Sequence, residues 1–415
     1  MILRRYRPII IGVTGSIGKT SAKEAIFYVL QDRLKVRMSP KNYNSEIGLP
    51  LSIIGAQTAG RSLLGWLGVF LTALKILIVK DEDYPEVLVL EMGVDHPGDM
   101  DYLTKIAPPT VGVVTSVSYS HFEYFGSVAN IKKEKQVLIE NIDRKGLAIL
   151  NYDSEPAREM AEASKARVLT YGFKPGAELL AQDVNFNFAK GSYDLAGVNF
   201  KLNNQGAIVP VFMKNVMTES ALYAALAAAA VGLHFKMNLV DIAARLEDFS
   251  LPPGRMNILP GIKHTFIIDD SYNSSPDASI AALDILGRIK VEAGAAKYAI
   301  LGDMLELGSY TEEGHLVVGK KAASSDLQGL IVVGERARFI LKGASQAGME
   351  DGSLFYFDKP EEAARFLQNR LKAGDISLIK GSQGMRMEKA VMEIMAEPDR
   401  AAELLVRQGE DWRDR

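Results

Sequence analysis

Val13-Thr14-Gly15-Ser16-Ile17-Gly18-Lys19-Thr20-Ser21 is the stretch that decides the predicted fold. The apolar run Ile9-Ile10-Ile11 precedes it, and a pattern typical of a helix begins near Ala22. Strand, glycine loop and helix in this order are typical of a phosphate loop, in which backbone N–H groups face an anion. Lys19 would reach a β- or γ-phosphate, and the Thr20 hydroxyl would bind Mg²⁺. Because Val13 stands where the strict pattern has a glycine, this stretch alone leaves a chance turn open.

Composition limits the classes of protein to which the chain can belong. Its 415 residues are enough for about two or three domains. The formal net charge of -3 provides no basic field, which argues against a nucleic-acid partner. The chain has no cysteine, so disulfides and thiolate metal sites are excluded and a reducing compartment is expected. The short apolar run after Arg4, Arg5 and Arg7 is needed as the first strand, which argues against a signal peptide.

One segment, residues 63–79 (LLGWLGVFLTALKILIV), is almost wholly apolar, and only Lys75 in it is charged. Its length of about 17 residues is at the lower limit for a membrane span. Three interpretations stay open: a buried or partly exposed helix of the first domain, a helix lying in a membrane interface, or a true span. In the second, Trp66 and Lys75 would lie among the headgroups. Lys75 interrupts the segment, which argues against the span.

The first part of the chain alternates apolar runs with helical patterns, as in a doubly wound parallel sheet. The run at 87–90 is typical of a strand covered on both faces, and Glu91 follows it. Ligands bind beyond the carboxyl ends of parallel strands, so Glu91 is a candidate Mg²⁺ ligand, with a solvated acid as the alternative. His121 follows the next buried run, and by residue type alone packing is favoured over catalysis.

The remainder of the chain predicts an antiparallel patch and then a second α/β unit. Residues 167–211 are rich in strand and turn signals, and a linker is expected at Leu251-Pro252-Pro253-Gly254. Later strands each end in a glycine-containing turn without a second phosphate loop, so this unit would close over the nucleotide held by the first. The predicted fold class is α/β. A central ATP-binding domain with a doubly wound parallel sheet would span residues 1–252, with the apolar helix inserted, and a C-terminal Rossmann-like domain residues 253–415.

Eight short motifs follow one another in order along nearly the whole chain. They are Thr14-Gly15-Ser16-Ile17-Gly18-Lys19-Thr20, Glu91-Met92-Gly93, His121 with Lys135, Leu150-Asn151-Tyr152-Asp153, Gly254-Arg255, Asp270-Ser271-Tyr272-Asn273-Ser274-Ser275-Pro276, Gly302-Asp303-Met304-Leu305-Glu306-Leu307-Gly308 and Lys380-Gly381-Ser382. Each motif is loose, but eight in register are specific. Together they resemble the Mur ligases, and most closely the MurF-type branch, which adds D-alanyl-D-alanine to a UDP-N-acetylmuramoyl tripeptide.

The resemblance implies an ADP-forming carboxylate–amine ligase that uses ATP and two Mg²⁺ ions and forms an acyl phosphate. It implies catalytic roles for Lys19, Glu91, His121 and Lys135, with Lys135 modified by CO₂ to a carbamate. Mg²⁺ ligands would be Thr20, Glu91 and His121. Nucleotide contacts are implied for Gly15, Ser16, Ile17, Gly18, Lys19, Thr20, Ser21, Asn151, Arg255, Asp270, Tyr272 and Asn273. Substrate contacts are implied for Asn42, Asn44, Ser116, Lys380 and Ser382, and further second-domain site residues are Asp303 and Glu306.

Some assignments stay open at this point. Lys132 and Lys133 leave the register of the modified lysine undecided, and His315 and the C-terminal residues 398–415 are expected on the solvated surface. MurF-type ligases begin with a UDP-binding domain, whereas here the phosphate loop lies near residue 1. We therefore expect an enzyme without that domain, whose acyl donor is either UDP-linked or lipid-linked.

The resemblance further implies a cytoplasmic monomer of peptidoglycan precursor synthesis, and hence of cell wall formation, cell shape and division. Its partners would be a peptidyl-sugar substrate and a dipeptide amine, without nucleic acid, and membrane-surface contact through residues 63–79 is an open alternative. Two other functions are retained. One is another Mur-type amide ligase such as a poly-γ-glutamate-like synthetase, and the other is a non-enzymatic nucleotide-binding partner subunit.

Overall fold

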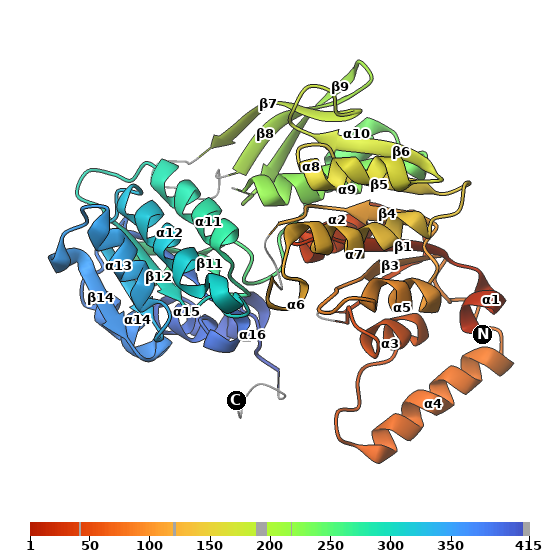
Figure 1. The fold of residues 1–415 in the computed structure, drawn as a ribbon, viewed down its shortest axis with the longest axis horizontal. Helices are drawn as coiled ribbons and strands as arrows, with labels where there is room; N and C mark the ends of the chain where they lie inside the picture. Colours follow the sequence, from red (N-terminus) through yellow and green to blue (C-terminus); the bar gives the residue numbers. More distant parts are fainter. Residues whose placement is uncertain (41–42, 119–121, 188–196, 217, 410–415) are drawn as a thin grey trace.

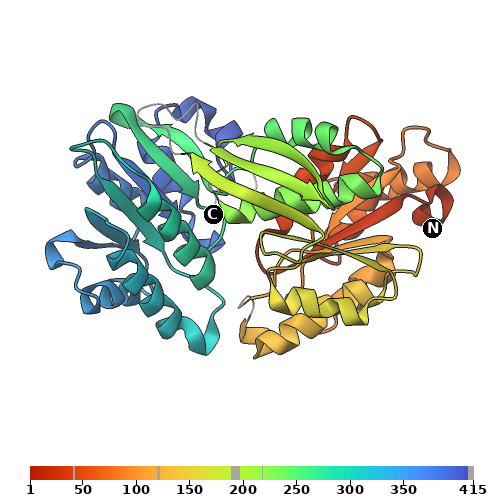
Figure 2. The ribbon, with the colours of Figure 1, turned by 90° about the horizontal axis from the view of Figure 1, so that it is seen from above.

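The computed structural model describes residues 1–415 except 41–42, 119–121, 188–196, 217 and 410–415. The chain forms two α/β units that lie side by side, each built on a sheet of its own (Figures 1 and 2). The predicted α/β class is therefore confirmed. The division at residues 252 and 253 stays a prediction, although the segment between α10 and β10 is where the chain passes from one sheet to the other.

The first sheet has nine strands in the described residues, in the order β2-β3-β1-β4-β5-β6-β7-β8-β9. Strands β1 to β6 pair in parallel, and β7 to β9 form an antiparallel extension. This is the edge that the turn-rich composition predicts. The strands are β1 (Ile9–Thr14), β2 (Val36–Met38), β3 (Val87–Glu91), β4 (Val111–Val114), β5 (Leu147–Asn151), β6 (Arg167–Gly172), β7 (Leu179–Asn187), β8 (Gly197–Asn204) and β9 (Ala207–Lys214).

Helices cover both faces of the first sheet. Successive residues of β1 point to opposite faces, so Ile11 and Val13 join a core with α2, α9 and α10, whereas Ile10 joins a core with α3, α5 and α7. The alanine-rich helix α9 is buried along most of its length. The helices are α1 (Ile2–Tyr6), α2 (Lys19–Leu30), α3 (Gly48–Ile54), α4 (Leu63–Ile78), α5 (Asp99–Ile106), α6 (Phe122–Phe125), α7 (Val128–Glu140), α8 (Glu155–Arg158), α9 (Glu219–His234) and α10 (Leu239–Glu247), with a 3₁₀ turn η1 (Glu159–Ala163).

Within the part of the chain that the structure describes, the second sheet has six strands in the order β10-β11-β15-β12-β13-β14, of which β10 alone is antiparallel to its neighbour. Its core is divided between a face covered by α11, α12 and α13 and a face covered by α14 and α15. Its strands are β10 (Asn257–Gly261), β11 (Thr265–Asp270), β12 (Lys297–Gly302), β13 (Gly329–Val333), β14 (Leu354–Phe357) and β15 (Ile376–Lys380). Its helices are α11 (Pro276–Arg288), α12 (Thr311–Ala323), α13 (Arg338–Gln346), α14 (Pro360–Gln368), α15 (Glu388–Ile394) and α16 (Ala401–Leu404).

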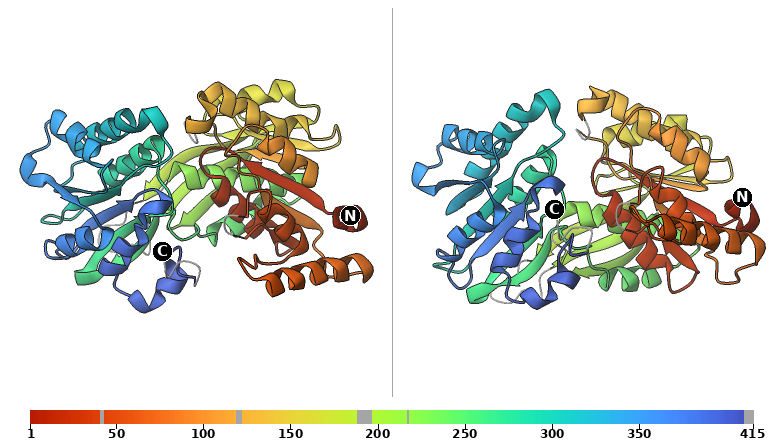
Figure 3. Two further views of the ribbon diagram at one scale, coloured as in Figure 1. Left: turned by 60° about the horizontal axis from the view of Figure 1, so that its bottom comes forward. Right: turned by 90° about the horizontal axis from the view of Figure 1, so that it is seen from below.

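The apolar segment forms α4, which lies at the edge of the first unit, away from the second (Figure 3). Most of its large apolar side chains are exposed, and only Val69 and Ile76 are buried. Among the described residues, no helix has both the length and the apolar character needed to cross a membrane.

The expectation of a solvated C-terminal segment is wrong for part of that segment. Ala401 and Leu405 are buried against the second sheet. The Arg407 side chain is also buried, and its guanidinium lies 2.6 Å from the Glu388 carboxylate. The stretch is rich in charged residues, and the sequence does not reveal which of these charges have partners. The apolar contact and the buried ion pair were therefore not predicted.

Candidate active site

The phosphate loop joins β1 to α2. Gly15 adopts φ 149° and Gly18 adopts φ 83°, conformations that residues with a side chain rarely adopt. A Cβ atom on Gly15 would lie 2.0 Å from the Thr115 hydroxyl oxygen, so the close approach of β4 also requires glycine here. The N–H of Ser16 donates to the Ser116 carbonyl oxygen at 2.6 Å. The residues after β4 therefore support the curved loop at the N-terminus of α2.

Lys19 begins α2 and folds back over this loop. Its ammonium group donates to the Gly15 carbonyl oxygen at 2.7 Å and to that of Ser16 at 3.4 Å. Burial lowers the pKa of Lys19 below its usual value, and the neighbouring Glu91 carboxylate opposes that shift. A cation and the free N–H groups of a helix start thus lie together, which is an arrangement suited to binding an anion.

Arg255 connects the second unit to the phosphate loop. Its guanidinium lies 3.9 Å from the centre of the Tyr272 ring and donates to the Thr20 hydroxyl oxygen at 3.3 Å. Burial raises the pKa of Tyr272, so its hydroxyl stays protonated at neutral pH. Three residues that are far apart in the sequence are therefore brought together where the two units meet.

Glu91 ends β3, the strand beside β1, and only 3% of it is exposed. Its Oε2 atom accepts no hydrogen bond within the described part of the chain. The Lys23 ammonium lies 3.7 Å from that atom, and the Asn44 side-chain amide lies 3.5 Å from Oε1. A buried carboxylate oxygen without a hydrogen bond is unfavourable unless a cation or water binds it. The arrangement therefore suits a metal ligand better than it suits a solvated strand-end acid.

Lys23 is a charged neighbour of this site that the sequence reasoning missed. It is fully buried and donates to the Ser39 carbonyl oxygen at 2.8 Å. A signal existed, because Lys23 follows Lys19 by four residues and so lies on the same face of α2.

Lys135 is the buried lysine of α7, with 1% exposed. Burial lowers its pKa well below the usual value, and the nearby positive charge of Lys19 lowers it further. On the same helix Lys133 is exposed, and Lys132 forms an ion pair with Glu159. The structure therefore distinguishes the three lysines: only Lys135 lies inside, near Lys19 of the phosphate loop.

Two predicted site residues, Asn42 and His121, lie outside the described residues. Across the described ranges no cluster of three or more His, Asp or Glu side chains could hold a metal ion by itself. Asn151, at the end of β5, is buried, and its side-chain oxygen accepts the N–H of Asp153 at 3.0 Å. Ser116 interacts with the loop: its hydroxyl oxygen accepts the N–H of Ile17 at 3.3 Å.

The predicted residues of the second unit form a buried cluster at the carboxyl ends of β11 and β15. The Lys380 ammonium donates to an Asp270 carboxylate oxygen at 2.6 Å and to the Asn273 carbonyl oxygen at 2.8 Å. Burial raises the pKa of Asp270, and Lys380 opposes that shift. The Ser382 hydroxyl accepts the N–H of Leu305 at 2.8 Å. These side chains are bonded to one another and hold three loops together.

The prediction that His315 lies on the solvated surface is wrong. It is fully buried in α12, and its Nε2 accepts the N–H of Met304 at 3.0 Å. Burial lowers its pKa. The Asp303 carboxylate in the same motif accepts the N–H of Ala337 at 2.7 Å. Both side chains thus fix the loop after β12 rather than meeting the phosphate loop directly.

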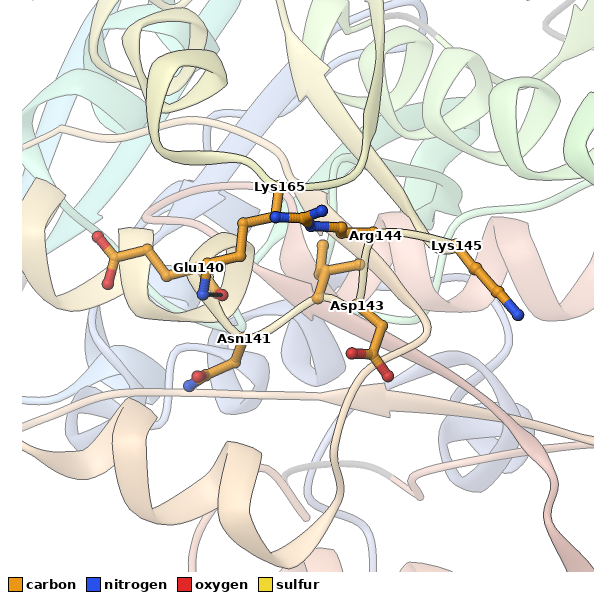
Figure 4. A pocket seen from close by; sticks show the side chains of 7 residues that line it. Glu140, Asn141, Asp143, Arg144, Lys145 and Lys165 are labelled. Atoms are coloured by element: carbon orange, nitrogen blue, oxygen red, sulfur yellow. Dashed lines mark hydrogen bonds between the residues drawn. The ribbon is translucent and has the colours of Figure 1, made fainter.

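A separate hollow of about 670 Å³ is lined by residues 140–145 and Lys165 (Figure 4). Residues 141–145 join α7 to β5, and Lys165 precedes β6, so the hollow lies at the amino ends of these parallel strands. Phosphate loops lie at the opposite edge. The hollow is therefore not part of the candidate active site.

Three features define the class of protein. They are a phosphate loop supported by the neighbouring strand, a buried acid at the end of another strand, and an arginine from a second α/β unit. The chain is a phosphate-loop protein of two α/β units, with a candidate nucleotide site where they meet.

Comparison with known proteins identifies the family. Residues 71–232 match the Mur ligase middle domain, and residues 254–383 match the Mur ligase glutamate ligase domain. The chain belongs to the Mur ligase family. It is 30% identical over 391 residues to the UDP-N-acetylmuramoyl-tripeptide--D-alanyl-D-alanine ligase of Mycobacterium tuberculosis (strain ATCC 25618 / H37Rv), covering 90% of this chain and 70% of that protein. It is 28% identical over 390 residues to the protein of that name from Bacillus subtilis (strain 168), covering 94% and 76%.

Solved structures agree with this assignment. MurF from Acinetobacter baumannii is similar with a TM-score of 0.77 and 25% identity, over 94% of this chain and 77% of that one. The MurF ligase of Thermotoga maritima in complex with ADP gives a TM-score of 0.77 and 26% identity, over 94% and 80%. The family resemblance inferred from the eight motifs is confirmed.

Proposed function

We propose that this chain is an ATP-dependent, ADP-forming ligase that joins D-alanyl-D-alanine to a muramoyl tripeptide in peptidoglycan precursor synthesis. The names of its relatives support the substrates. The observation that carries the proposal is the meeting of Thr20 with Arg255 beside the buried Glu91 carboxylate. ATP is the substrate suited to that site, so we propose that the reaction takes place in the cytoplasm.

In this proposal the loop holds the phosphates of ATP. Backbone N–H groups at the start of α2 and the Lys19 ammonium would contact the β- and γ-phosphates. Arg255 would add a planar fork of donors for phosphate oxygens. Its hydrogen bond to Thr20 supports this role, because that hydroxyl lies at the start of the phosphate-binding helix. Tyr272, Asn273 and Asn151 would line the rest of the nucleotide site.

Glu91 and Thr20 fit Mg²⁺ in their donor chemistry, because both offer hard oxygen ligands and one Glu91 oxygen has no hydrogen bond. We propose that they hold the ion together with His121. Mg²⁺ would neutralise charge on the phosphate oxygens as the reaction proceeds. The Lys23 ammonium, 3.7 Å from the Oε2 atom of Glu91, would help to orient that carboxylate.

The reaction would proceed in two displacements. A carboxylate oxygen of the muramoyl tripeptide attacks the γ-phosphorus of ATP, the bond to the β-phosphate oxygen breaks, and ADP leaves. The amine of D-alanyl-D-alanine then attacks the acyl carbon, inorganic phosphate leaves, and the nitrogen loses a proton. Negative charge develops in both steps, so Lys19 and Arg255 would act chiefly by stabilising it.

We propose that Lys135 is carbamylated. Only a neutral amine adds to CO₂, and burial favours the neutral form of this lysine. The amine nitrogen forms a bond to the carbon of CO₂ and loses a proton, so the product is a carbamate anion, which would balance the positive charge of Lys19 and support a second Mg²⁺. Intact-protein mass spectrometry in bicarbonate buffer would detect the added CO₂ on the wild type and its absence from Lys135→Met.

An ADP-release assay tests the proposed function. Purified protein with ATP and Mg²⁺ is mixed with UDP-linked or lipid-linked muramoyl tripeptide and with D-alanyl-D-alanine or L-glutamate, and the product mass is recorded. We expect release that needs a muramoyl donor and the dipeptide, and that is lost in Lys19→Ala but kept in the exposed-lysine control Lys174→Ala. Release with L-glutamate would favour a poly-γ-glutamate-like synthetase. ATP binding without release under any condition would reject the enzyme and favour a nucleotide-binding subunit.

A further inference from the structure

The side of α4 that points away from the protein is a continuous apolar surface. It consists of Leu63, Leu64, Leu67, Phe70, Leu71, Leu74 and Ile78, each more than half exposed. At about 100° per residue these positions fall within a sector of about 120°. We call this sector the outer face of α4. No polar side chain of the helix falls within it.

The opposite side fixes α4 to the body. Val69 and Ile76 are buried, and Ile76 belongs to the core that also contains residues of α3 and β3. The Tyr6 hydroxyl of α1 donates to the Ile76 carbonyl oxygen at 2.8 Å, and the Ser62 hydroxyl caps the helix by accepting the N–H of Gly65 at 3.1 Å. The helix therefore packs on the protein through one side, and the apolar side chains of the outer face take no part in that packing.

Positive charges surround the outer face. Residues 61–80 contain Arg61, Lys75 and Lys80 and no acidic residue. Arg4 and Arg5 are exposed on α1, which contacts the C-terminal part of α4 through a hydrogen bond from Arg5 to the Ile78 carbonyl oxygen at 3.5 Å.

Acidic residues follow in the loop after α4, but two of them are already paired. The Glu82 carboxylate lies 3.0 Å from the Lys80 ammonium, and the Asp83 carboxylate lies 2.8 Å from that of Lys35. Arg4, Arg5, Arg61 and Lys75 remain beside the apolar face to interact with anions.

We infer that the outer face of α4 docks on a membrane surface that contains anionic lipids. An apolar helix face bordered by Lys and Arg matches the chemistry of an interface, with acyl chains below and anionic headgroups at the same level as the basic side chains. Trp66, whose indole N–H donates to the Gly60 carbonyl oxygen at 3.1 Å, suits the headgroup region. With 16 residues, α4 lies in the plane of the membrane surface.

A second copy of the chain is a poorer occupant. The positive charges beside the outer face would repel one another if two copies met there, whereas an anionic lipid surface attracts them. The inference does not depend on the proposed catalytic reaction.

Vesicle co-sedimentation of the full-length protein tests the inference. We expect binding to vesicles of phosphatidylcholine with phosphatidylglycerol, weaker binding to phosphatidylcholine alone, and weaker binding to the anionic vesicles at high salt. The variant Phe70→Glu/Leu74→Glu should bind at least about tenfold more weakly, because two charges enter the apolar face. Arg4→Glu/Arg5→Glu should lose the preference for anionic vesicles and keep the weaker binding to phosphatidylcholine.

The matched control is Val240→Glu/Ile208→Glu, which adds the same charges at exposed apolar positions on α10 and β9. It should bind vesicles like the wild type. All variants change exposed side chains, so unchanged thermal unfolding checks that each one folds. No binding by the folded wild type, or equal binding by Phe70→Glu/Leu74→Glu, would overturn the inference. A dimer of the wild type in light scattering that this variant abolishes, without vesicle binding, would assign the face to a second copy.

Discussion

The surroundings of Lys135 and Lys380 are two regions that bury a lysine side chain, and they differ in the partners that they offer to its amine. The two residues are almost equally buried, with 1% and 2% exposed. Lys380, between the strand ends of the second sheet, donates to Asp270 and to the Asn273 carbonyl oxygen. Lys135, beside the phosphate loop, donates a hydrogen bond to no group in the described part of the chain. Burial and the neighbouring Lys19 lower its pKa, and the Asp95 and Glu134 carboxylates oppose that shift with smaller effect.

We propose that this difference makes Lys135 the more reactive of the two lysines, while the predicted substrate contact of Lys380 stays a prediction. A buried ammonium that donates to a carboxylate partner holds the loops around it together. A buried amine without such a partner, next to another cation, prefers the neutral form, and the neutral amine is the nucleophile. The Lys135 region therefore has chemistry that the Lys380 region lacks.

The largest expected effect is on stability in the second unit. Lys380→Met leaves the buried Asp270 carboxylate without its partner, so the free energy of unfolding at neutral pH should fall by about 3–5 kcal/mol. Urea unfolding measures it. Because burial raises the pKa of Asp270, which can take up a proton instead, the loss should shrink as the pH falls below neutral. Asp270→Leu/Lys380→Met should recover most of the stability, and a single variant as stable as the wild type would mean that the pair holds nothing together.

Lys135→Met should act on catalysis instead. If the side chain carries the charge that supports the reaction, ADP release should fall about 100- to 1,000-fold, while the free energy of unfolding at neutral pH should not decrease. Lys133→Met is the matched control, since it changes the same residue type two positions earlier on the exposed side of α7. Equal activity of the two variants would remove Lys135 from the mechanism.

The burial of Lys135 could have been predicted from the helix pattern, although the motifs alone did not reveal it. The sequence contains three similar lysines here: Lys132, Lys133 and Lys135. Ile131 and Ile139 define the apolar face of α7, and at about 100° per residue only Lys135 falls between them. The helix period could therefore have selected it. His315 is similar, because it lies three residues before the buried Val318 of α12.

Other features could not be derived in this way. In α4 both faces are apolar, so the hydrophobic pattern has no period from which to predict the side that packs. The contact between Arg255 and Thr20 joins residues that are 235 positions apart, and only the meeting of the two units creates it. The glycine loop and the strand ending at Glu91 were predictable because each is a local pattern that is typical of a parallel α/β sheet.

The pH dependence of stability would sharpen the assignment of Lys135. Its pKa is lowered in the folded protein, whereas the unfolded chain binds that proton up to about pH 10.4. Between these values the unfolded state holds more protons, so this residue makes stability rise with pH, by at most about 1.4 kcal/mol per unit. In bicarbonate-free buffer, Lys135→Met should thus be more stable than the wild type near neutral pH, and the difference should shrink toward pH 10. Parallel pH profiles would mean that Lys135 is charged in the folded state.

Lys132→Met should have the smallest effect, because Lys132 pairs with Glu159 where half of the carboxylate side chain is exposed. Water screens such a pair, so the free energy of unfolding should fall by about 0.5 kcal/mol relative to Lys133→Met. High salt should remove most of that difference, whereas it should leave the loss in Lys380→Met almost unchanged because the Asp270 pair is buried. A large loss of unfolding free energy in Lys132→Met that high salt does not remove would show that solvent exposure does not determine how much each of these lysines contributes to stability. The contrast between the Lys135 and Lys380 regions would then need a cause other than burial.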